Sequence, residues 1–244
     1  MKKVRINTGT VGLVYRKDNY KKVLTEGTYF LSPCDKVVKY DMAMPFVPYT
    51  ELNILLRDEK LAELLTVVKV ADNEIALKYE DGIFKGVLTP GKYAYFKGVI
   101  DYTFTNVDLG RIRIPESIDK TILQKAALVN YIRAYVVESY EKGIMFVDGK
   151  FERILDPGVY YYFKNAIPIT VLKADMRQLQ MEVSGQEILT RDKAALRVNF
   201  YAQYKVKDVE KALVDAKDYE KQLYILLQLA LREYIGMFTL DEML

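Results

Sequence analysis

The sequence predicts an α+β protein of three small β-rich modules with helical connections, the last module continuing into a domain of one sheet and several helices. Two observations support this fold class. A strand–turn–strand pattern with the same closing motif occurs three times, and a long alternating strand followed by two amphipathic stretches comes last. The three closing motifs are VLTEGTYF (23–30), VLTPGKYAYF (87–96) and ILDPGVYYYF (154–163).

A pattern typical of a tight β-hairpin precedes each closing motif in the sequence. Asp-Gly pairs favour the type I′ turn, because both central residues of that turn have positive φ, which glycine adopts freely and aspartate tolerates. We assign the hairpin turns to Asp18-Asn19, Asp81-Gly82 and Asp148-Gly149. An aromatic residue four positions before the leucine of each motif fits a strand with one buried face.

A second turn lies inside each closing motif. Pro90-Gly91 and Pro157-Gly158 favour a type II turn, in which proline takes the first central position and glycine, with positive φ, takes the second. Gly27 has the same place in the first copy. The glycines to which we give a structural role in turns are Gly27, Gly82, Gly91, Gly149 and Gly158.

The segments between the copies have the apolar spacing of helices. Residues 50–68 and 115–137 place apolar residues three or four positions apart, but their β-branched ends near Val67 and Val136 predict strands. The predicted divisions are 1–69 and 70–137, each a β-rich module with its helical connection, 138–174 for the third module and 175–244 for the sheet-plus-helices core. We interpret the copies as structural modules that stack, with a repeated ligand site as the alternative.

The C-terminal sixty residues predict a long strand and two helices. Apolar and polar residues alternate over 196–206, so one face of this strand is expected in a core. Asp208 and Asp218 have the position of N-caps for helices at 209–216 and 219–237. The face that the longer helix is expected to bury consists of Leu223, Leu226, Leu227, Ala230, Leu231, Tyr234 and Ile235.

Ile225 and Leu229 form a second, smaller apolar stripe on the longer helix. One interpretation is a helix enclosed between the sheet and a neighbouring element. The other makes these two residues the candidate contact of an oligomer.

The composition excludes several classes of active site. The chain has no histidine and one cysteine, Cys34, which rules out His-based nucleophile pairs, Cys/His zinc sites and intramolecular disulfides. Phosphate-binding glycine spacings are absent from the sequence, and a net charge of +3 does not favour a nucleic-acid partner. We therefore expect no enzyme and no cofactor or metal, and keep a hydrolase with an unidentified carboxylate site as an alternative.

The sequence offers neither a secretory signal nor an apolar run of the roughly 18 residues that a membrane-spanning helix needs. We therefore expect a cytoplasmic protein.

Residues 184–244 resemble the core of the SPFH or band 7 domain of stomatins, prohibitins, flotillins and, nearest, bacterial slipins. The resemblance rests on an ordered set of short motifs rather than on any one of them. These motifs are Thr190 and Asp192, then Tyr204, Val206 and Asp208, then Ala212, Asp218-Tyr219, Leu231-Arg232, Gly236 and Leu240-Asp241-Glu242. The arrangement of β repeats before such a domain is similar to that of the major vault protein.

The resemblance implies a non-enzymatic scaffold that assembles with itself into rings or cages and organises membrane proteins or proteases, at a peripheral position on the inner face of the membrane. A monomeric adaptor that displays the β repeats is the alternative. Thr239 to Glu242, TLDE, fits a capping box and predicts a new helix. Because only Met243 and Leu244 follow, we expect a fragment whose self-association depends mainly on segments beyond Leu244.

Overall fold

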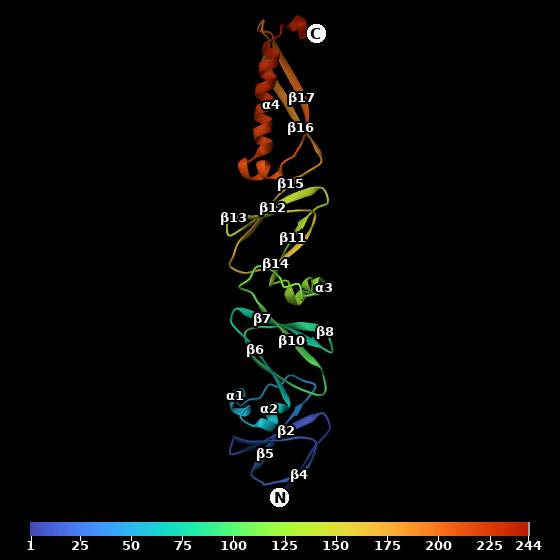
Figure 1. Cartoon of the computed structure of the whole chain (residues 1–244), viewed down its shortest axis with the longest axis vertical. Coiled ribbons are helices and arrows are strands. Elements are labelled where there is room, and N and C mark those ends of the chain that lie inside the picture. Colours follow the sequence, from blue (N-terminus) through green and yellow to red (C-terminus); the bar gives the residue numbers. More distant parts are fainter. Residues whose placement is uncertain (244) are drawn as a thin grey trace. The chain divides into compact units, whose positions relative to one another are not determined.

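A computed structural model of the chain describes residues 1–243, which divide into two compact units. The first unit comprises Met1–Ile132 with Phe163–Asn165, and the second comprises Arg133–Tyr162 with the residues from Ala166 onward. Strands predominate over mostly short helices in both (Figure 1). The predicted mixed α+β class is therefore confirmed.

The first unit contains two groups of five strands. The first group is β1 (Lys2–Ile6), β2 (Thr10–Arg16), β3 (Asn19–Leu24), β4 (Gly27–Leu31) and β5 (Asp35–Asp41). The second group is β6 (Leu65–Val70), β7 (Glu74–Glu80), β8 (Ile83–Leu88), β9 (Gly91–Phe96) and β10 (Tyr102–Asp108). In each group the first strand pairs with the fourth, and the second strand lies between the third and the fifth.

A third group of five strands has the same pairings. It consists of β11 (Ile132–Val137), β12 (Glu141–Val147), β13 (Lys150–Leu155), β14 (Gly158–Phe163) and β15 (Ile169–Asp175). In all three groups the ladder between the second and third strands has a bulge shortly before the hairpin turn, at Val14/Tyr15, Lys78/Tyr79 and Met145/Phe146. The three groups therefore agree in strand order and in the position of this irregularity.

All three hairpin turns have positive φ at both central residues, as type I′ needs, and two of them lie at the predicted pairs. These pairs are Asp81-Gly82 (φ +50° and +76°) and Asp148-Gly149 (φ +51° and +72°). The assignment of Asp18-Asn19 was wrong by one residue, because Arg16 pairs with Asn19 and the positive φ values belong to Lys17 (+50°) and Asp18 (+61°). Asn19 supports this turn by donating its side-chain amide to the carbonyl of Lys17 at 3.1 Å.

The second turn of each group differs from the predicted type II geometry, which has φ near +80° at its glycine. Gly27, Gly91 and Gly158 have φ of +148°, +154° and +157° and each begins a strand. The physical reason is a tyrosine two residues later. The hydroxyl of Tyr93 donates to the carbonyl of Thr89 at 3.0 Å, and its ring would lie 3.4 Å from a Cβ added at Gly91.

The connection between the first two groups contains two short helices, α1 (Leu52–Leu55) and α2 (Glu59–Glu63). Each buries one leucine completely, Leu55 and Leu61, in a core shared with Leu13 of β2 and Phe96 of β9. The strands predicted near Val67 and Val136 are present as β6 and β11. The next connection holds α3 (Lys120–Leu123) and a 3-10 turn at Ala126–Leu128.

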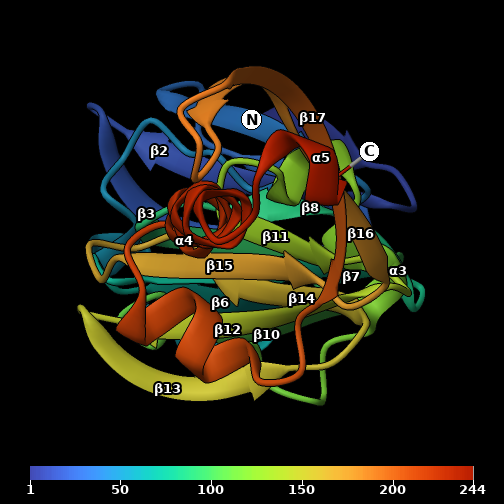
Figure 2. The same cartoon turned by 90° about the horizontal axis from the view of Figure 1, so that it is seen from above.

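The C-terminal part of the second unit is a long hairpin with a helix along it. The hairpin consists of β16 (Gln178–Leu189) and β17 (Ala195–Lys205), and α4 (Tyr219–Gly236) runs beside it (Figure 1). A π-helical turn, Lys211–Asp215, precedes α4, and α5 (Leu240–Met243) follows it. Figure 2 looks down the axis of α4. As predicted, Asp218 is the N-cap of α4 and accepts the backbone N–H of Lys221 at 3.0 Å.

Candidate functional site

The hairpin β16–β17 has one half-buried face and one polar, exposed face. Every second residue of β17 is exposed along its whole length, as the alternation of the sequence predicts. On the inner face Val183 is completely buried and Ile188 nearly so. On the outer face Tyr201 keeps 58% of its surface exposed. The hairpin therefore offers a single apolar side, and α4 packs against it.

Polar contacts near the start and in the middle of α4 orient the helix on the hairpin. Near its first turn, the hydroxyl of Tyr204 on β17 donates to Glu220 at 3.2 Å, and burial together with this carboxylate raises the pKa of Tyr204 to about 12. Further along, the side-chain amide of Gln228 donates to Gln186 of β16 at 3.0 Å. At the last turn Ile235 is 2% exposed. Leu223, Leu227 and Leu231 are half-buried between these points.

The opposite side of α4 carries a group of exposed apolar side chains, with the charged Glu233 among them. Ile225 and Leu229, the predicted oligomer contact, lie one turn apart with 46% and 57% of their surfaces exposed. The prediction that Leu226, Ala230 and Tyr234 are buried was wrong, since all three are exposed beside them. The exposed apolar face of α4, as we call it below, consists of Ile225, Leu226, Leu229, Ala230, Tyr234 and Met237.

The apolar face of α4 is exposed because the two-stranded hairpin is too narrow to cover the whole helix. α4 is apolar around more of its circumference than the stripe of about 100° that a surface helix needs. A sheet of two strands covers only one side of such a helix. The other side is open to solvent within residues 1–243, where Leu226 is 62% and Tyr234 61% exposed.

The turn after α4 is tied to the tip of the hairpin by a group that we call the Arg191 cluster: Thr190, Arg191, Asp192, Thr239 and Glu242. The guanidinium of Arg191 lies 3.1 Å from both carboxylate oxygens of Glu242 and donates to the carbonyl of Met237 at 3.2 Å. The backbone N–H of Arg191 donates to the carbonyl of Phe238 at 2.8 Å. Two motifs 51 residues apart in the sequence therefore meet in one place.

Asp192 and Glu242 accept backbone donors in this cluster. Asp192 accepts the Thr190 hydroxyl at 2.5 Å and the N–H of Leu240 at 3.2 Å. Glu242 accepts the N–H of Thr239 at 2.7 Å, which is the carboxylate half of the predicted capping box. The Thr190 hydroxyl holds the pKa of Asp192 below its usual range, and the Thr239 N–H, with Arg191 beside it, does the same for Glu242.

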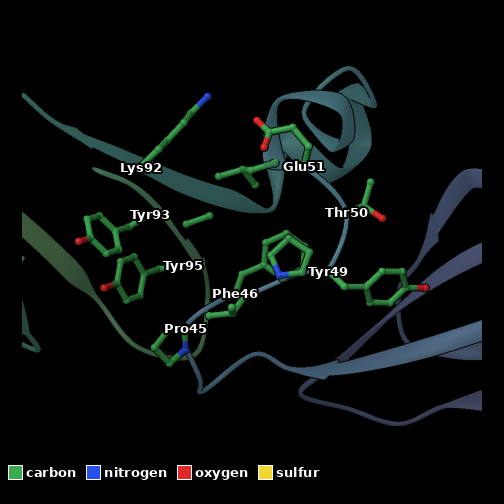
Figure 3. A pocket seen from close by; sticks show the side chains of 12 residues that line it. Pro45, Phe46, Tyr49, Thr50, Glu51, Lys92, Tyr93 and Tyr95 are labelled. Carbon is green, nitrogen blue, oxygen red and sulfur yellow. The ribbon is translucent and has the colours of Figure 1, made fainter. Parts of the chain in front are cut away.

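The first unit holds an open groove of about 620 Å³ between β9 and the segment Pro45–Leu52 (Figure 3). The groove forms because this segment pairs with β9 at Phe46, whose N–H donates to the carbonyl of Ala94 at 2.9 Å, and then diverges. Figure 3 shows Tyr93 and Tyr95 on one side of the groove and Tyr49 pointing away on the other. Its lining is mainly apolar, with Glu51 and Lys92 as the charged residues.

The described residues provide no arrangement typical of catalysis. Within residues 1–243 no group of three His, Cys, Asp or Glu side chains could hold a metal ion. Every buried side-chain nitrogen or oxygen of that range has a hydrogen-bond partner. Cys34 is exposed, and the five turn glycines lie in hairpin turns (Gly82, Gly149) or at the start of strands (Gly27, Gly91, Gly158). Among residues 1–243, no helix combines the length and the apolar character that a membrane span requires.

Residues 135–244 match the SPFH domain / Band 7 family. The matched segment begins in β11 and includes β12–β15, the hairpin and α4. It also contains the exposed apolar face of α4 and the Arg191 cluster. The predicted resemblance to the SPFH superfamily is therefore confirmed for this part of the chain.

About half of the chain is similar to curated relatives, stomatin homologues among them. An uncharacterized protein of Methanocaldococcus jannaschii is 37% identical over 125 residues, which is 50% of this chain and 61% of the relative. A stomatin homolog of Pyrococcus horikoshii is 30% identical over 112 residues, 45% of this chain and 40% of the relative. Stomatin-4 of Caenorhabditis elegans is 27% identical over 113 residues, 45% of this chain and 39% of the relative. The matches thus cover less than two thirds of each of these relatives.

Sequence reasoning did not find the Arg191 cluster or the full width of the α4 face. The short motifs Thr190–Asp192 and Leu240–Glu242 were visible, but their contact spans 51 residues and has no local signal. For α4, the signal was the nearly continuous apolar run from Leu223 to Leu231, which a one-sided amphipathic helix does not need.

Proposed function

We propose that the chain is a non-enzymatic scaffold of the stomatin-like or slipin type, which assembles with itself through the exposed apolar face of α4. The observation that carries the proposal is this face, because monomeric proteins rarely expose contiguous apolar patches of this kind outside interaction sites. The match to the SPFH domain / Band 7 family supports the same class of function. That family also suggests an association with membranes and with membrane-protein partners.

The strength expected of this contact follows from its size. A stable interface buries about 800 Å² on each partner, more than six side chains on one helix present. A single α4 contact should therefore be too weak to offset the loss of translational and rotational freedom. Repeated around a closed ring, however, many equivalent weak contacts become cooperative. We expect little association of residues 1–244 at micromolar concentration, and defined large oligomers of any longer chain that contains them.

We further propose that the three groups of five strands are copies of one module, which serves as a spacer next to the assembling domain. Their shared strand order, bulge position and extended glycines support this. A monomeric adaptor that displays these modules to a partner is the alternative, favoured by the apolar groove beside β9.

Multi-angle light scattering on the natural full-length protein tests the assembly. Changing Leu226 and Leu229 together to glutamate places two charges on the α4 face and should reduce the large oligomer to monomers. The matched control is Ile83→Glu in β8, which has an exposed fraction of 59%, close to that of Leu229, and should leave assembly unchanged. A full-length protein that is monomeric without any substitution would favour the adaptor.

A further inference from the structure

β4 of the first strand group has a free outer edge with a groove beside it. Within residues 1–243 β4 pairs with β1 alone. The groove has a volume of about 330 Å³, and Val14, Lys21, Lys22, Phe30, Leu31 and Asp35 are among the residues that line it. Both β3 and β4 contribute to its walls, and β3 is likewise an edge strand of its sheet.

The second strand group shows what lies at the equivalent edge there. β9 has the position of β4: Gly91 begins β9 opposite Val70, as Gly27 begins β4 opposite Ile6. The chain segment before α1 covers the outer edge of β9. Pro45 forms a β-bridge with Tyr95 in this segment. The following residue donates its N–H to the carbonyl of Ala94 at 2.9 Å, and the hydroxyl of Tyr102 donates to the carbonyl of Ala43 at 3.4 Å.

The third group has a corresponding contact at its fourth strand. The N–H of Phe163 donates to the carbonyl of Ile112, in the segment before α3, at 2.9 Å. An extended segment thus contacts the fourth strand in two of the three groups, and β4 differs from both.

The difference leaves Phe30 uncovered. Phe30 lies three residues after the first glycine of its strand, the position that Ala94 has in β9. Ala94 is 2% exposed beneath the segment that pairs with it, whereas Phe30 is 62% exposed. Because alternate residues of an antiparallel strand direct their N–H and C=O groups to the same side, the equivalent position implies that the backbone groups of Phe30 face outward. This is an edge on which another strand can pair.

Ser32, directly after the C-terminal end of β4, limits how far an added strand can pair with β4. The N–H of Ser32, the next outward-facing donor, already donates to the Asp35 carboxylate at 3.1 Å. Asp35 is also paired with Arg16 at 2.7 Å, so its negative charge is compensated. A strand added to β4 would therefore pair at Thr28 and Phe30 and end before Ser32.

The charges of the first group select the partner. Residues 1–41 contain nine Lys and Arg against four Asp and Glu, a net charge of +5, whereas the whole chain carries +3. Lys3 is opposite Phe30 in the β1–β4 ladder, and Lys21 and Lys22 line the groove. Two copies of this edge would repel each other, whereas an acidic segment would be attracted.

We propose that the β4 groove binds an extended acidic peptide segment of a partner protein, which adds as a strand to the outer edge of β4 and covers Phe30. Main-chain hydrogen bonds to β4 supply affinity, and the ring of Phe30 with the neighbouring lysines supplies preference for apolar and acidic side chains. This surface lies in the first unit and is independent of the α4 face.

The segment that covers β9 provides a probe of suitable chemistry. A fluorescein-labelled peptide with the sequence of residues 41–52, DMAMPFVPYTEL, carries two acidic residues and no basic one. Fluorescence anisotropy with the whole 244-residue chain should give saturable binding. Phe30→Glu should weaken it at least tenfold, because it removes the aromatic ring and opposes the acidic probe. Phe30→Pro, which removes the aromatic ring and the outward N–H without adding a charge, should weaken it to a similar extent.

The matched control is Phe151→Glu, because Phe151 is an exposed aromatic of β13 (47%) in another strand group, and it should leave binding unchanged. Thermal unfolding of each variant checks that the fold is retained. Absence of saturable binding up to millimolar concentration would overturn the proposal. So would binding that both Phe30 variants leave intact, since the probe would then occupy the edge of β9. Vesicles with 30% anionic lipid that bind the chain in a Phe30-dependent way, in place of the peptide, would assign the surface to a lipid partner instead.

Discussion

Arg191 and Glu242 form an ion pair with N–O distances of 3.1 Å to both carboxylate oxygens, across 51 residues of sequence. Both side chains are about half exposed, so the pair by itself adds little stability. Its position gives it a different role, because Arg191 also binds the carbonyls that end α4. The cluster therefore sets the direction in which the chain leaves α4.

Replacing Arg191 by methionine should loosen the end of α4 without changing the global unfolding temperature by more than a degree or two. The substitution keeps most of the side-chain length but removes the donors to Met237 and Glu242. Hydrogen exchange followed by mass spectrometry should show faster exchange at residues 237–242 and unchanged exchange in β16. Arg197→Met, on the exposed face of β17, is the control. Equal exchange in both variants would show that the cluster does not hold this turn.

The same cluster should respond to acid. Because the folded-state pKa of Glu242 lies below its unfolded value, the carboxylate stabilises the turn at pH above about 4.3. That contribution is lost as the pH falls through the lower folded-state pKa. The amide resonance of Thr239, which donates to Glu242, should therefore titrate with a midpoint below the ordinary pKa of a glutamate side chain. In Arg191→Met the midpoint should move upward, and an unshifted midpoint would contradict a contribution of Arg191.

The glycine that begins β9 should not tolerate a β-branched residue. Gly91 has φ +154°, and an added Cβ would meet the ring of Tyr93 at 3.4 Å. Gly91→Val should therefore lower the free energy of unfolding by about 1–3 kcal/mol, as measured by urea denaturation. Gly86→Val in β8 is the matched control, since an added Cβ there meets nothing within 4 Å and its φ is not positive. Similar stabilities for the two variants would refute the strain.

Local signals predicted much of the fold, and they failed where geometry depends on distant partners. Asp81-Gly82 identifies its hairpin because the positive φ values are a property of those two residues. The type II turn predicted from Pro90-Gly91 was wrong, because the ring of Tyr93 and its hydrogen bond to Thr89 hold the glycine in an extended conformation instead. The turn of the first hairpin lacks a glycine. Lys17 has a positive φ there, which its residue type does not predict.

In the candidate site, too, local signals predicted some features and not others. The start of α4 followed from Asp218, a cap that acts within one turn. The buried side of α4 could not be predicted from the sequence, because Leu226 and Leu227 are equally apolar. Only the width of the two-stranded hairpin determines which of the two side chains is covered. The meeting of Arg191 with Glu242 depends on the relative lengths of β17 and α4, which no short motif encodes.

The orientation of α4 predicts a sharp contrast between two positions on one helix. Ile235 is 2% exposed, so Ile235→Ala removes buried methyl groups and should lower the free energy of unfolding by about 2–4 kcal/mol. Leu226 is 62% exposed, so Leu226→Ala deletes a side chain of similar size that contacts mostly solvent and should change that free energy by less than about 0.5 kcal/mol. Both values come from urea denaturation of the 244-residue chain at a concentration where it is monomeric. A loss at Leu226 as large as that at Ile235 would mean that the α4 face is covered within the monomer. It would then be unavailable for assembly.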